Sequence, residues 1–296
     1  MHQKVRKTVK KMITEQDKNK VYFSNLLALS YPSIWKEICE VLAKYNYTAG
    51  KLTYTKDYWC RDFMPVQVGS DEFVQFRYDP DYLADLRKYK TNPDDTLKHF
   101  TDFDMKVAKS NLAVDGGNMV ACRNCKGETW VVMTDKVFAE NQEYSKDDVI
   151  TILEAKLKAK IILLPWAGSY EDKCGHTDGI VNFIDGKSDK PSVMAYYPLY
   201  RKEIANKMRK RLDAVFDVHE LSFTKDEENN WAYVNLLRTK DFIIVPGLGT
   251  DSDHEAMEQI ALLYPDYREH IHQVNIAPIV EEYGGAFNCL SWAVKI

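Results

Sequence analysis

Near its C-terminal end the chain reads Gly284-Gly285-Ala286-Phe287-Asn288-Cys289-Leu290-Ser291-Trp292, a stretch that sets one cysteine behind two glycines and ahead of an apolar run. Glycine permits backbone angles that other residues avoid and lets a substrate approach the main chain closely. The Cys289 thiol is therefore expected at a turn-to-strand junction, where it can face a pocket. A lone cysteine on an apolar segment is more often a small buried hydrophobic residue, so a catalytic role depends on partners elsewhere in the chain.

Length and composition are those of a soluble globular protein. The chain has 296 residues, of which 45% are hydrophobic and 28% charged, enough to bury a large core. A net charge of −4 argues against a general nucleic-acid binder. Residues 1–20 are basic and polar and lack the apolar stretch of a signal peptide, and no run approaches the length of a membrane span. We therefore expect a cytoplasmic protein that binds neither nucleic acid nor membrane. The sequence leaves open whether it forms a homo-oligomer.

The cysteines indicate a reduced protein. There are six, too sparse for a disulfide framework. Cys122 and Cys125, together with Cys174 and His176, offer four zinc ligands, but a second close pair at standard spacing is absent. We therefore expect ordinary thiols in a turn, and neither a metal nor a cofactor.

Apolar periodicity predicts strands and helices interleaved along the chain. Helical spacing predicts helices at residues 33–45, 145–157, 200–216 and 253–263. Short apolar runs predict strands at residues 51–54, 71–76, 129–133, 161–164, 180–184, 192–196, 231–236, 242–245, 271–274 and 290–294. Residues 79–104, which carry Pro80 and Pro93, are expected to form a long loop with at most a short helix.

This order suggests a repeating strand-strand-helix-strand unit in an α/β protein. No linker rich in Gly, Pro or Ser divides the chain. We therefore expect a basic arm or surface helix at residues 1–21 and one domain at residues 22–296.

Three upstream stretches supply partners for a catalytic thiol. In Gly175-His176-Thr177-Asp178, the histidine and the aspartate are two residues apart, so on an extended backbone both side chains project from one face. Such a pair suits acid–base chemistry. The alternative is an ordinary loop histidine beside an aspartate that caps the next turn.

The other two stretches each contain an acid. One sets it beside an aromatic residue, and the other sets it before two glycines. Trp59 offers an aromatic face close to Arg61 and Asp62, and Asp115 precedes two glycines that can bring the backbone close to a ligand. Each has an ordinary alternative, an ion pair in the first stretch and a simple turn in the second.

Taken in chain order, these stretches form a recognisable set. They are Trp59-Cys60-Arg61-Asp62-Phe63-Met64-Pro65, Asp115-Gly116-Gly117-Asn118, Gly175-His176-Thr177-Asp178, and Gly284-Gly285 with Cys289. The set resembles the agmatine deiminase and bacterial peptidylarginine deiminase family, which belongs to the guanidino-group-modifying enzymes. Tyr233-Val234-Asn235, followed by Val245-Pro246-Gly247, looks like the family's asparagine-bearing strand and its proline-containing turn. The resemblance runs from about Tyr22 to the C-terminus.

The resemblance implies both a fold and an activity. The fold is a five-bladed, pseudo-symmetric α/β propeller of ββαβ units, the pentein fold. The activity is hydrolytic deimination of a guanidino compound such as agmatine, arginine or peptidyl-arginine, giving a ureido product and ammonia without a cofactor. The sequence does not exclude an amidinotransferase, in which an amine takes the amidino group, or an inactive ligand-binding propeller.

The resemblance also implies roles at the matched positions. Cys289 would attack the guanidinium carbon, while Asp62 and Asp178 would grip guanidinium N–H groups through charge-assisted hydrogen bonds. His176 would protonate the departing ammonia and then activate water.

Three further positions are implied as site residues, and two other positions depart from the family pattern. Asp115 would orient His176, Trp59 would pack over the guanidinium or its alkyl stem, and Asn235 would lie in the site. Asn288 stands where relatives that act on agmatine usually carry His, and Ala286 replaces the usual third glycine. These departures put agmatine as the substrate in doubt.

Overall fold

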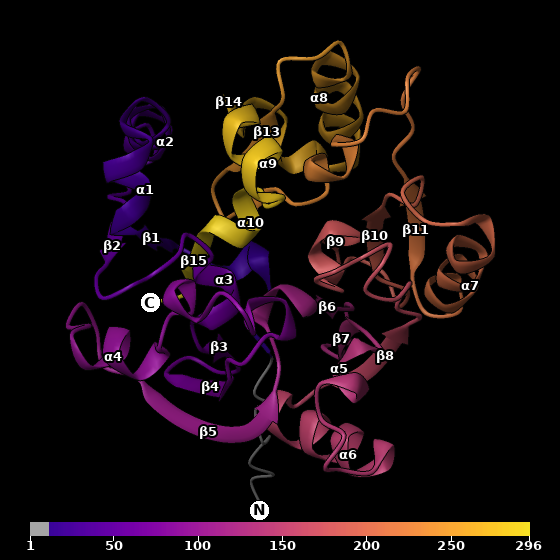
Figure 1. Ribbon diagram of the computed structural model, residues 1–296. Helices are drawn as coiled ribbons and strands as arrows, with labels where there is room; N and C mark the ends of the chain where they lie inside the picture. The colour runs from indigo at the N-terminus through magenta and orange to yellow at the C-terminus, as the bar shows by residue number, and fades with distance from the viewer. Residues whose placement is uncertain (1–11) are drawn as a thin grey trace, which may run out of the picture.

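The computed structural model describes residues 12–296, and within them it contains five three-stranded sheets (Figure 1). In every sheet the middle strand pairs antiparallel with one neighbour and parallel with the other. Helical segments join the two parallel strands in each case. The α/β class and the predicted recurrence of strand, strand, helix and strand are therefore confirmed.

The sheets are built from consecutive strands, with one exception at the chain ends. In their hydrogen-bonded order the strands are β15 (Ser291–Val294), β1 (Lys20–Ser24) and β2 (Gly50–Leu52); β3 (Val66–Gln67), β4 (Glu72–Arg77) and β5 (Lys106–Ala113); β6 (Val120–Arg123), β7 (Thr129–Thr134) and β8 (Lys160–Leu164); β9 (Val181–Asp185), β10 (Ser192–Ala195) and β11 (Asp217–Glu220); and β12 (Leu237–Arg238), β13 (Ile243–Gly247) and β14 (Ile271–Asn275).

The helices are mostly short. They are α1 (Asn25–Ser30), α2 (Pro32–Ala43), α3 (Cys60–Phe63), α4 (Pro93–Lys98), α5 (Lys136–Ala139), α6 (Lys146–Leu157), α7 (Lys202–Asp213), α8 (Ser252–Leu263), α9 (Ala277–Tyr283) and α10 (Phe287–Leu290). Single 3-10 turns are η1 (Glu15–Asp17), η2 (Asp81–Leu83), η3 (Arg87–Tyr89), η4 (Gly116–Asn118), η5 (Thr177–Gly179), η6 (Asn230–Tyr233) and η7 (Pro265–His270).

Local sequence explains where the longer helices begin. Proline occupies the first position of α2, where a missing N–H costs nothing. The Ser145 side chain caps α6, because its Oγ accepts a hydrogen bond from the Asp148 N–H at 3.1 Å. The helix predicted at residues 145–157 is therefore confirmed, with Ser145 as its N-terminal cap.

The two ends of the chain share one sheet. Strand β15 pairs antiparallel with β1, and Trp292 lies opposite Tyr22. The stretch that carries Cys289 is thereby anchored against the first strand of the chain.

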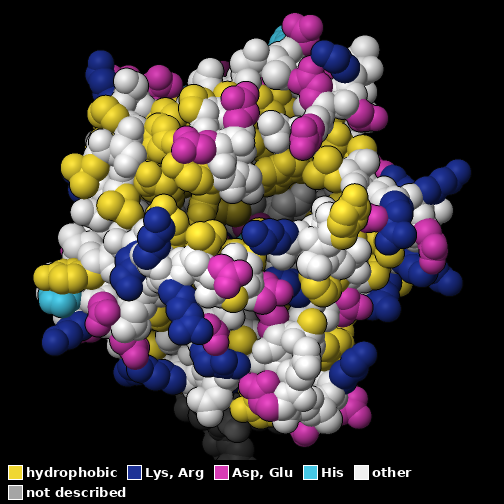
Figure 2. Space-filling model, viewed as in Figure 1, with side chains coloured by type: hydrophobic (Ala, Val, Ile, Leu, Met, Phe, Trp, Pro, Cys, Tyr) yellow, Lys and Arg dark blue, Asp and Glu magenta, His cyan; other side chains and the backbone are white. Residues whose placement is uncertain are grey.

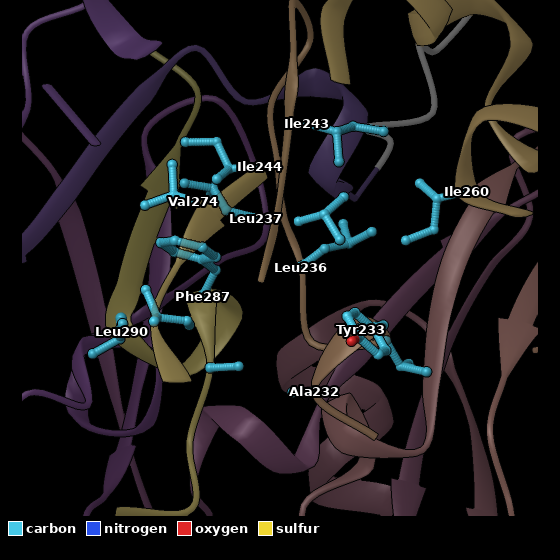
Figure 3. Close-up of a cluster of buried hydrophobic side chains, with 14 of the residues drawn as sticks. Ala232, Tyr233, Leu236, Leu237, Ile243, Ile244, Ile260, Val274, Phe287 and Leu290 are labelled. Atoms are coloured by element: carbon cyan, nitrogen blue, oxygen red, sulfur yellow. The ribbon is translucent and has the colours of Figure 1, made fainter. Parts of the chain in front are cut away.

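The largest hydrophobic cluster supports the segment around Cys289. It joins α2, α8 and α9 to the strands of the last sheet and includes Phe287 and Leu290 of α10. Figure 3 shows these two side chains packed beside Leu237, Ile244 and Val274. Because protein interiors are close-packed, this contact fixes the position of α10.

Four short segments meet at the centre of the molecule. Helix α3 contacts both α10 and η4, and η4 contacts η5. Figure 1 shows α3 and α10 at the centre, with the sheets around them. Each of the four motifs singled out in the sequence lies in or beside one of these segments.

One predicted strand is wrong. Residues 231–236 form most of the turn η6 and the bend after it, and β12 contains only two residues. Ala232, Tyr233 and Val234 are all fully buried. A short apolar run that is buried on every side has no alternation to separate a strand from a helical turn.

The segment just before the first strand packs against the rest of the structure. Residues 1–11 of the expected arm lie outside the described residues, whereas Met12 and Thr14 are buried. Strand β1 already begins at Lys20. Within residues 12–296, no helix is both long and apolar enough to span a membrane.

Trp292 is the residue on which we expect the first sheet to depend. Its ring stacks on Phe103 at 6.1 Å, and its indole N–H donates to the Pro65 carbonyl at 2.9 Å. Trp292→Ala should lower the free energy of unfolding by about 3–5 kcal/mol, because a large cavity would remain. Urea denaturation measures this. Tyr170→Ala, at a fully exposed position, is the control, and equal stability of the two variants would contradict this assignment.

Candidate active site

Cys289 lies in α10, the single helical turn directly ahead of β15. Its side chain is buried, and its backbone N–H donates to Asn235 Oδ1 at 3.2 Å. Gly284 ends α9 with a φ of 71°, a conformation that favours glycine. A Cβ on Gly285 would lie 2.2 Å from the Trp59 ring. The two glycines therefore let the chain turn and let Trp59 pack against the segment of the thiol.

Asp178 is the carboxylate nearest to the thiol. Its Oδ2 lies 3.6 Å from Cys289 Sγ and accepts a hydrogen bond from Asn288 Nδ2 at 2.7 Å. Its other oxygen, Oδ1, is buried without a hydrogen-bond partner. Buried polar atoms in native proteins are rarely left unpaired. This oxygen is therefore available for a donor that a ligand would bring.

His176 lies between two carboxylates. Its Nε2 is 3.2 Å from Asp115 Oδ2, and its Nδ1 is 3.8 Å from Asp62 Oδ1. Burial opposes the charged imidazolium, but Asp62 and the hydrogen bond to Asp115 raise the pKa of His176 well above its ordinary value. The two carboxylates thus favour the protonated imidazolium, which can donate a proton.

Gly117 is required for this close arrangement. Its N–H donates to Asp62 Oδ1 at 3.0 Å. A Cβ at this position would lie 2.5 Å from His176 Nδ1 and 2.7 Å from Asp62 Oδ1. Only glycine lets the histidine and the carboxylate meet at this turn.

Burial sets the charge states of the remaining groups. Burial and the nearby Asp178 raise the pKa of the Cys289 thiol to about 12, while a hydrogen bond with His176 opposes this rise. Burial also raises the pKa of Asp62, against the lowering effect of His176, and Asp115 adds to the rise. The site thus holds a neutral thiol among carboxylates that compete for a single imidazolium.

The structure brings together all seven residues singled out in the sequence, but it corrects one geometric argument. Residues 177–179 form the 3-10 turn η5, so the backbone between His176 and Asp178 is not extended. The turn still directs both side chains to Cys289, because each makes a contact with its thiol.

Aromatic side chains stand next to the site at Trp59. Tyr58 and Tyr283 lie within 6.4 Å of the Trp59 ring, measured between ring centroids. The face of the molecule drawn in Figure 1 is hollowed near its centre, and hydrophobic side chains gather along part of the rim (Figure 2). The flat aromatic ring of Trp59 suits the alkyl stem or the face of a planar cation.

Sequence reasoning missed Tyr82. This residue lies in η2, within the region predicted as a loop, and its hydroxyl donates to Asp115 Oδ2 at 3.1 Å. Its ring meets the His176 imidazole edge-on, with 6.0 Å between centroids. A polar loop carries no periodicity, so nothing local marks this residue.

The structure does not favour a zinc site at the cysteine pair. Cys122 is fully buried in a hydrophobic cluster, whereas Cys125 is exposed and contacts Asp189. Within residues 12–296, no group of three or more His, Cys, Asp or Glu side chains has the geometry to hold a metal ion.

Comparison with known proteins decides the family. The family model of the Porphyromonas-type peptidyl-arginine deiminases matches residues 3–294. The chain belongs to this family. The resemblance stated from the four motifs is therefore confirmed. Among curated protein sequences, none matches the chain.

Solved structures share the fold of this family member at low sequence identity. The C. jejuni agmatine deiminase has a TM-score of 0.75 and 17% identity, with 97% of this chain and 96% of that one covered. The Enterococcus faecalis agmatine deiminase has a TM-score of 0.71 and 18% identity, with the same coverage of 97% and 96%. An amidinotransferase from Microseira wollei has a TM-score of 0.61 and 12% identity, with 96% of each chain covered.

Gly117→Ala tests the packing of the site. The added methyl group should push His176 away from Asp62 and lower kcat/KM by about a hundredfold, since a displacement of about 1 Å can cost that much. Deiminase kinetics and a thermal melt measure the two effects separately. Gly69→Ala is the control. Gly69 lies in the turn between β3 and β4, where a Cβ would meet only the flexible Glu72 side chain. Full activity of Gly117→Ala would show that the close approach of His176 and Asp62 is not needed.

Proposed function

We propose that this protein is a hydrolase that deiminates a guanidino compound through a covalent intermediate on Cys289. The observation that carries this proposal is a buried thiol in contact with Asp178, whose other carboxylate oxygen, Oδ1, is a buried acceptor without a partner. Asp62 and Asp115 lie on either side of the nearby imidazole. A planar cation with several N–H donors would supply both the charge and the hydrogen bonds that this site lacks.

Binding would also activate the thiol. A guanidinium ion next to Cys289 places a positive charge beside the sulfur, and a nearby cation lowers the pKa of a thiol. The high pKa of Cys289 in the free protein would then fall only when substrate is present. The thiol would remain protonated and inert until the substrate arrives.

The reaction proceeds in two steps. When the substrate binds, the Cys289 thiol loses its proton to solvent. The thiolate then forms an S–C bond to the guanidinium carbon, and a C–N bond breaks as His176 gives its proton to the leaving nitrogen, which departs as ammonia. Water then attacks the resulting thiouronium. One water proton returns to His176 and the other passes to ammonia through solvent, while the S–C bond breaks to give the ureido product and the thiolate.

We also propose that the five sheets form one closed five-bladed propeller and a single catalytic domain. The pairing of β1 with β15, the shared strand order of all five sheets and the central contacts of α3, η4, η5 and α10 support this arrangement.

A substrate panel with a nucleophile variant tests the function. The wild-type protein should release ammonia and form a ureido product from at least one of agmatine, arginine, peptidyl-arginine and methylated arginines. Cys289→Ala should abolish turnover and keep the fold, because the change is small. Cys122→Ala is the matched control, since its thiol is equally buried but lies in another cluster.

Two outcomes of this panel would change the assignment. Normal turnover by Cys289→Ala would disprove the covalent mechanism. Transfer of the amidino group to an added amine, with no ammonia released in its absence, would make the protein an amidinotransferase.

The roles of Asp178 and His176 can be separated. Asp178→Asn places N–H donors against the donors of the cation, so kcat/KM should fall at least about a hundredfold, mainly through weaker binding. His176→Ala should leave affinity within about tenfold and lower kcat by roughly 10²–10⁴. Calorimetric binding in the Cys289→Ala background and steady-state kinetics with Cys289 present measure the two quantities. If His176→Ala lost binding while Asp178→Asn bound normally, the roles would be misassigned.

A further inference from the structure

Asn288, immediately before Cys289, joins the site to an ion-pair network behind it. Its Nδ2 donates to Asp178 Oδ2 at 2.7 Å, and its Oδ1 accepts from Arg61 Nη2 at 2.6 Å. Both ends of this buried amide are therefore used, one by an anion and the other by a cation.

The chemistry of the two neighbours fixes the orientation of the amide. A guanidinium offers only donors and a carboxylate only acceptors. The carbonyl of Asn288 must therefore face Arg61, and its NH₂ group must face Asp178. The reverse orientation would set donor against donor and acceptor against acceptor. Arg61 thereby ensures that Asp178 receives a hydrogen bond.

The N-terminal segment holds Arg61 in turn. The same Nη2 atom donates to Glu15 Oε1 at 3.2 Å, and Glu15 also pairs with Lys18 at 2.6 Å. Glu15, Lys18 and Arg61 line a cavity of about 30 Å³. Burial raises the pKa of Glu15, but the charges of Lys18 and Arg61 bring this pKa below its ordinary value. The carboxylate that anchors Arg61 is thus ionised.

We propose that Asn288 is a positioning residue that holds Asp178 as an oriented carboxylate, and that the contact of Glu15 with Arg61 fixes the Asn288 amide for this purpose. The inference rests on the proposed function, in which Asp178 binds the guanidinium. With Oδ2 occupied by Asn288, Oδ1 is the oxygen left for the substrate. A segment 273 residues away in sequence, the difference between positions 15 and 288, would thereby set the affinity for substrate.

This arrangement opposes the effect of burial on Asp178. Burial raises the pKa of Asp178, whereas His176, the Asn288 amide, Arg61 and the Asn235 amide lower it. Cys289 and Asp62 also face this carboxylate, and its charge contributes to the raised pKa of Tyr200. Among these groups, Asn288 is a neutral donor. Its removal should therefore raise the pKa of Asp178 without removing a charge.

Asn288→Ala in the Cys289→Ala background tests the inference, with agmatine and arginine as calorimetric probes. At about pH 7 the affinity should fall roughly tenfold to a hundredfold, the usual worth of a hydrogen bond to a charged group. A raised pKa means that the carboxylate is lost at a higher pH, so the acid limb of binding should move upward. The affinity should recover partly as the pH increases.

A control variant separates this role from a structural one. Asn124→Ala removes another buried asparagine, whose amide bonds to Glu128 and Asp189 far from the thiol. It should bind the probes as the Cys289→Ala parent does. If Asn288→Ala weakened binding by one factor at every pH, or not at all, the proposed role would be overturned.

The Glu15 link has its own matched pair. Glu15→Gln and Glu15→Ala remove the same charge, but only Gln keeps an acceptor for Arg61. We expect Glu15→Ala to bind the probes roughly threefold to tenfold more weakly than Glu15→Gln, a loss typical of one hydrogen bond. Equal affinities would overturn the part assigned to Glu15. This pair also decides the inference if Asn288→Ala does not fold.

Failure of the proposed function would be recognised separately. If the Cys289→Ala parent bound no guanidinium compound, that function would be wrong. The ¹³C-carboxyl resonance of Asp178, assigned by its loss in Asp178→Asn, still reports the pKa of this group without any ligand. An upward shift of that pKa in Asn288→Ala supports the positioning role, and an unchanged pKa overturns it.

Discussion

Three carboxylates, those of Asp62, Asp115 and Asp178, are buried around a single imidazole, and the rest of the site follows from their repulsion. Buried anions must be paired or must give up their charge. His176 is shared between Asp62 and Asp115, and Asp178 depends on Asn288 and on the distant charge of Arg61. A positive charge is what such a site still accepts, and a guanidinium ion would supply it together with N–H donors for the unpartnered Oδ1 of Asp178. Burial raises the pKa of the Cys289 thiol and the neighbouring carboxylates add to the rise, so substrate binding and thiol activation depend on the same electrostatic balance.

The fold creates this balance by bringing short turns together, since no long element crosses the site. Each functional side chain lies in or beside one of α3, η4, η5, η6 and α10, which connect the five sheets. Short turns leave the chain free to place a polar side chain inward while the flanking strands bury apolar residues on both sides. Gly117 and Gly285 contribute in the same way. Each lacks a Cβ, and this absence leaves room for a neighbouring side chain to come close.

The hydrogen-bond network behind the thiol makes the site depend on residues near both ends of the described chain. The first and last strands share a sheet, and the segment before the first strand places Glu15 within hydrogen-bond distance of Arg61. The C-terminal stretch with Cys289 and the N-terminal stretch with Glu15 are therefore both held by the sheet that contains β1 and β15. Affinity for substrate is then coupled to the pairing of the first and last strands. The physical link is a series of hydrogen bonds in which the Asn288 amide has only one acceptable orientation.

The sequence by itself determined the residue types of the site, the α/β class, the four longest helices and most of the strands, because apolar periodicity and turn residues act over short distances. It also determined the family, through four motifs whose order and spacing are local facts. Only the tertiary structure decided that Tyr82 contacts Asp115 and that Glu15 reaches Asn288 through Arg61. It also decided that residues 231–236 bend where a strand was predicted. These features depend on which distant segments share the interior. A hydrogen bond between residues far apart leaves no periodic mark in either segment, and a run buried on all sides has no pattern that distinguishes a strand from a turn.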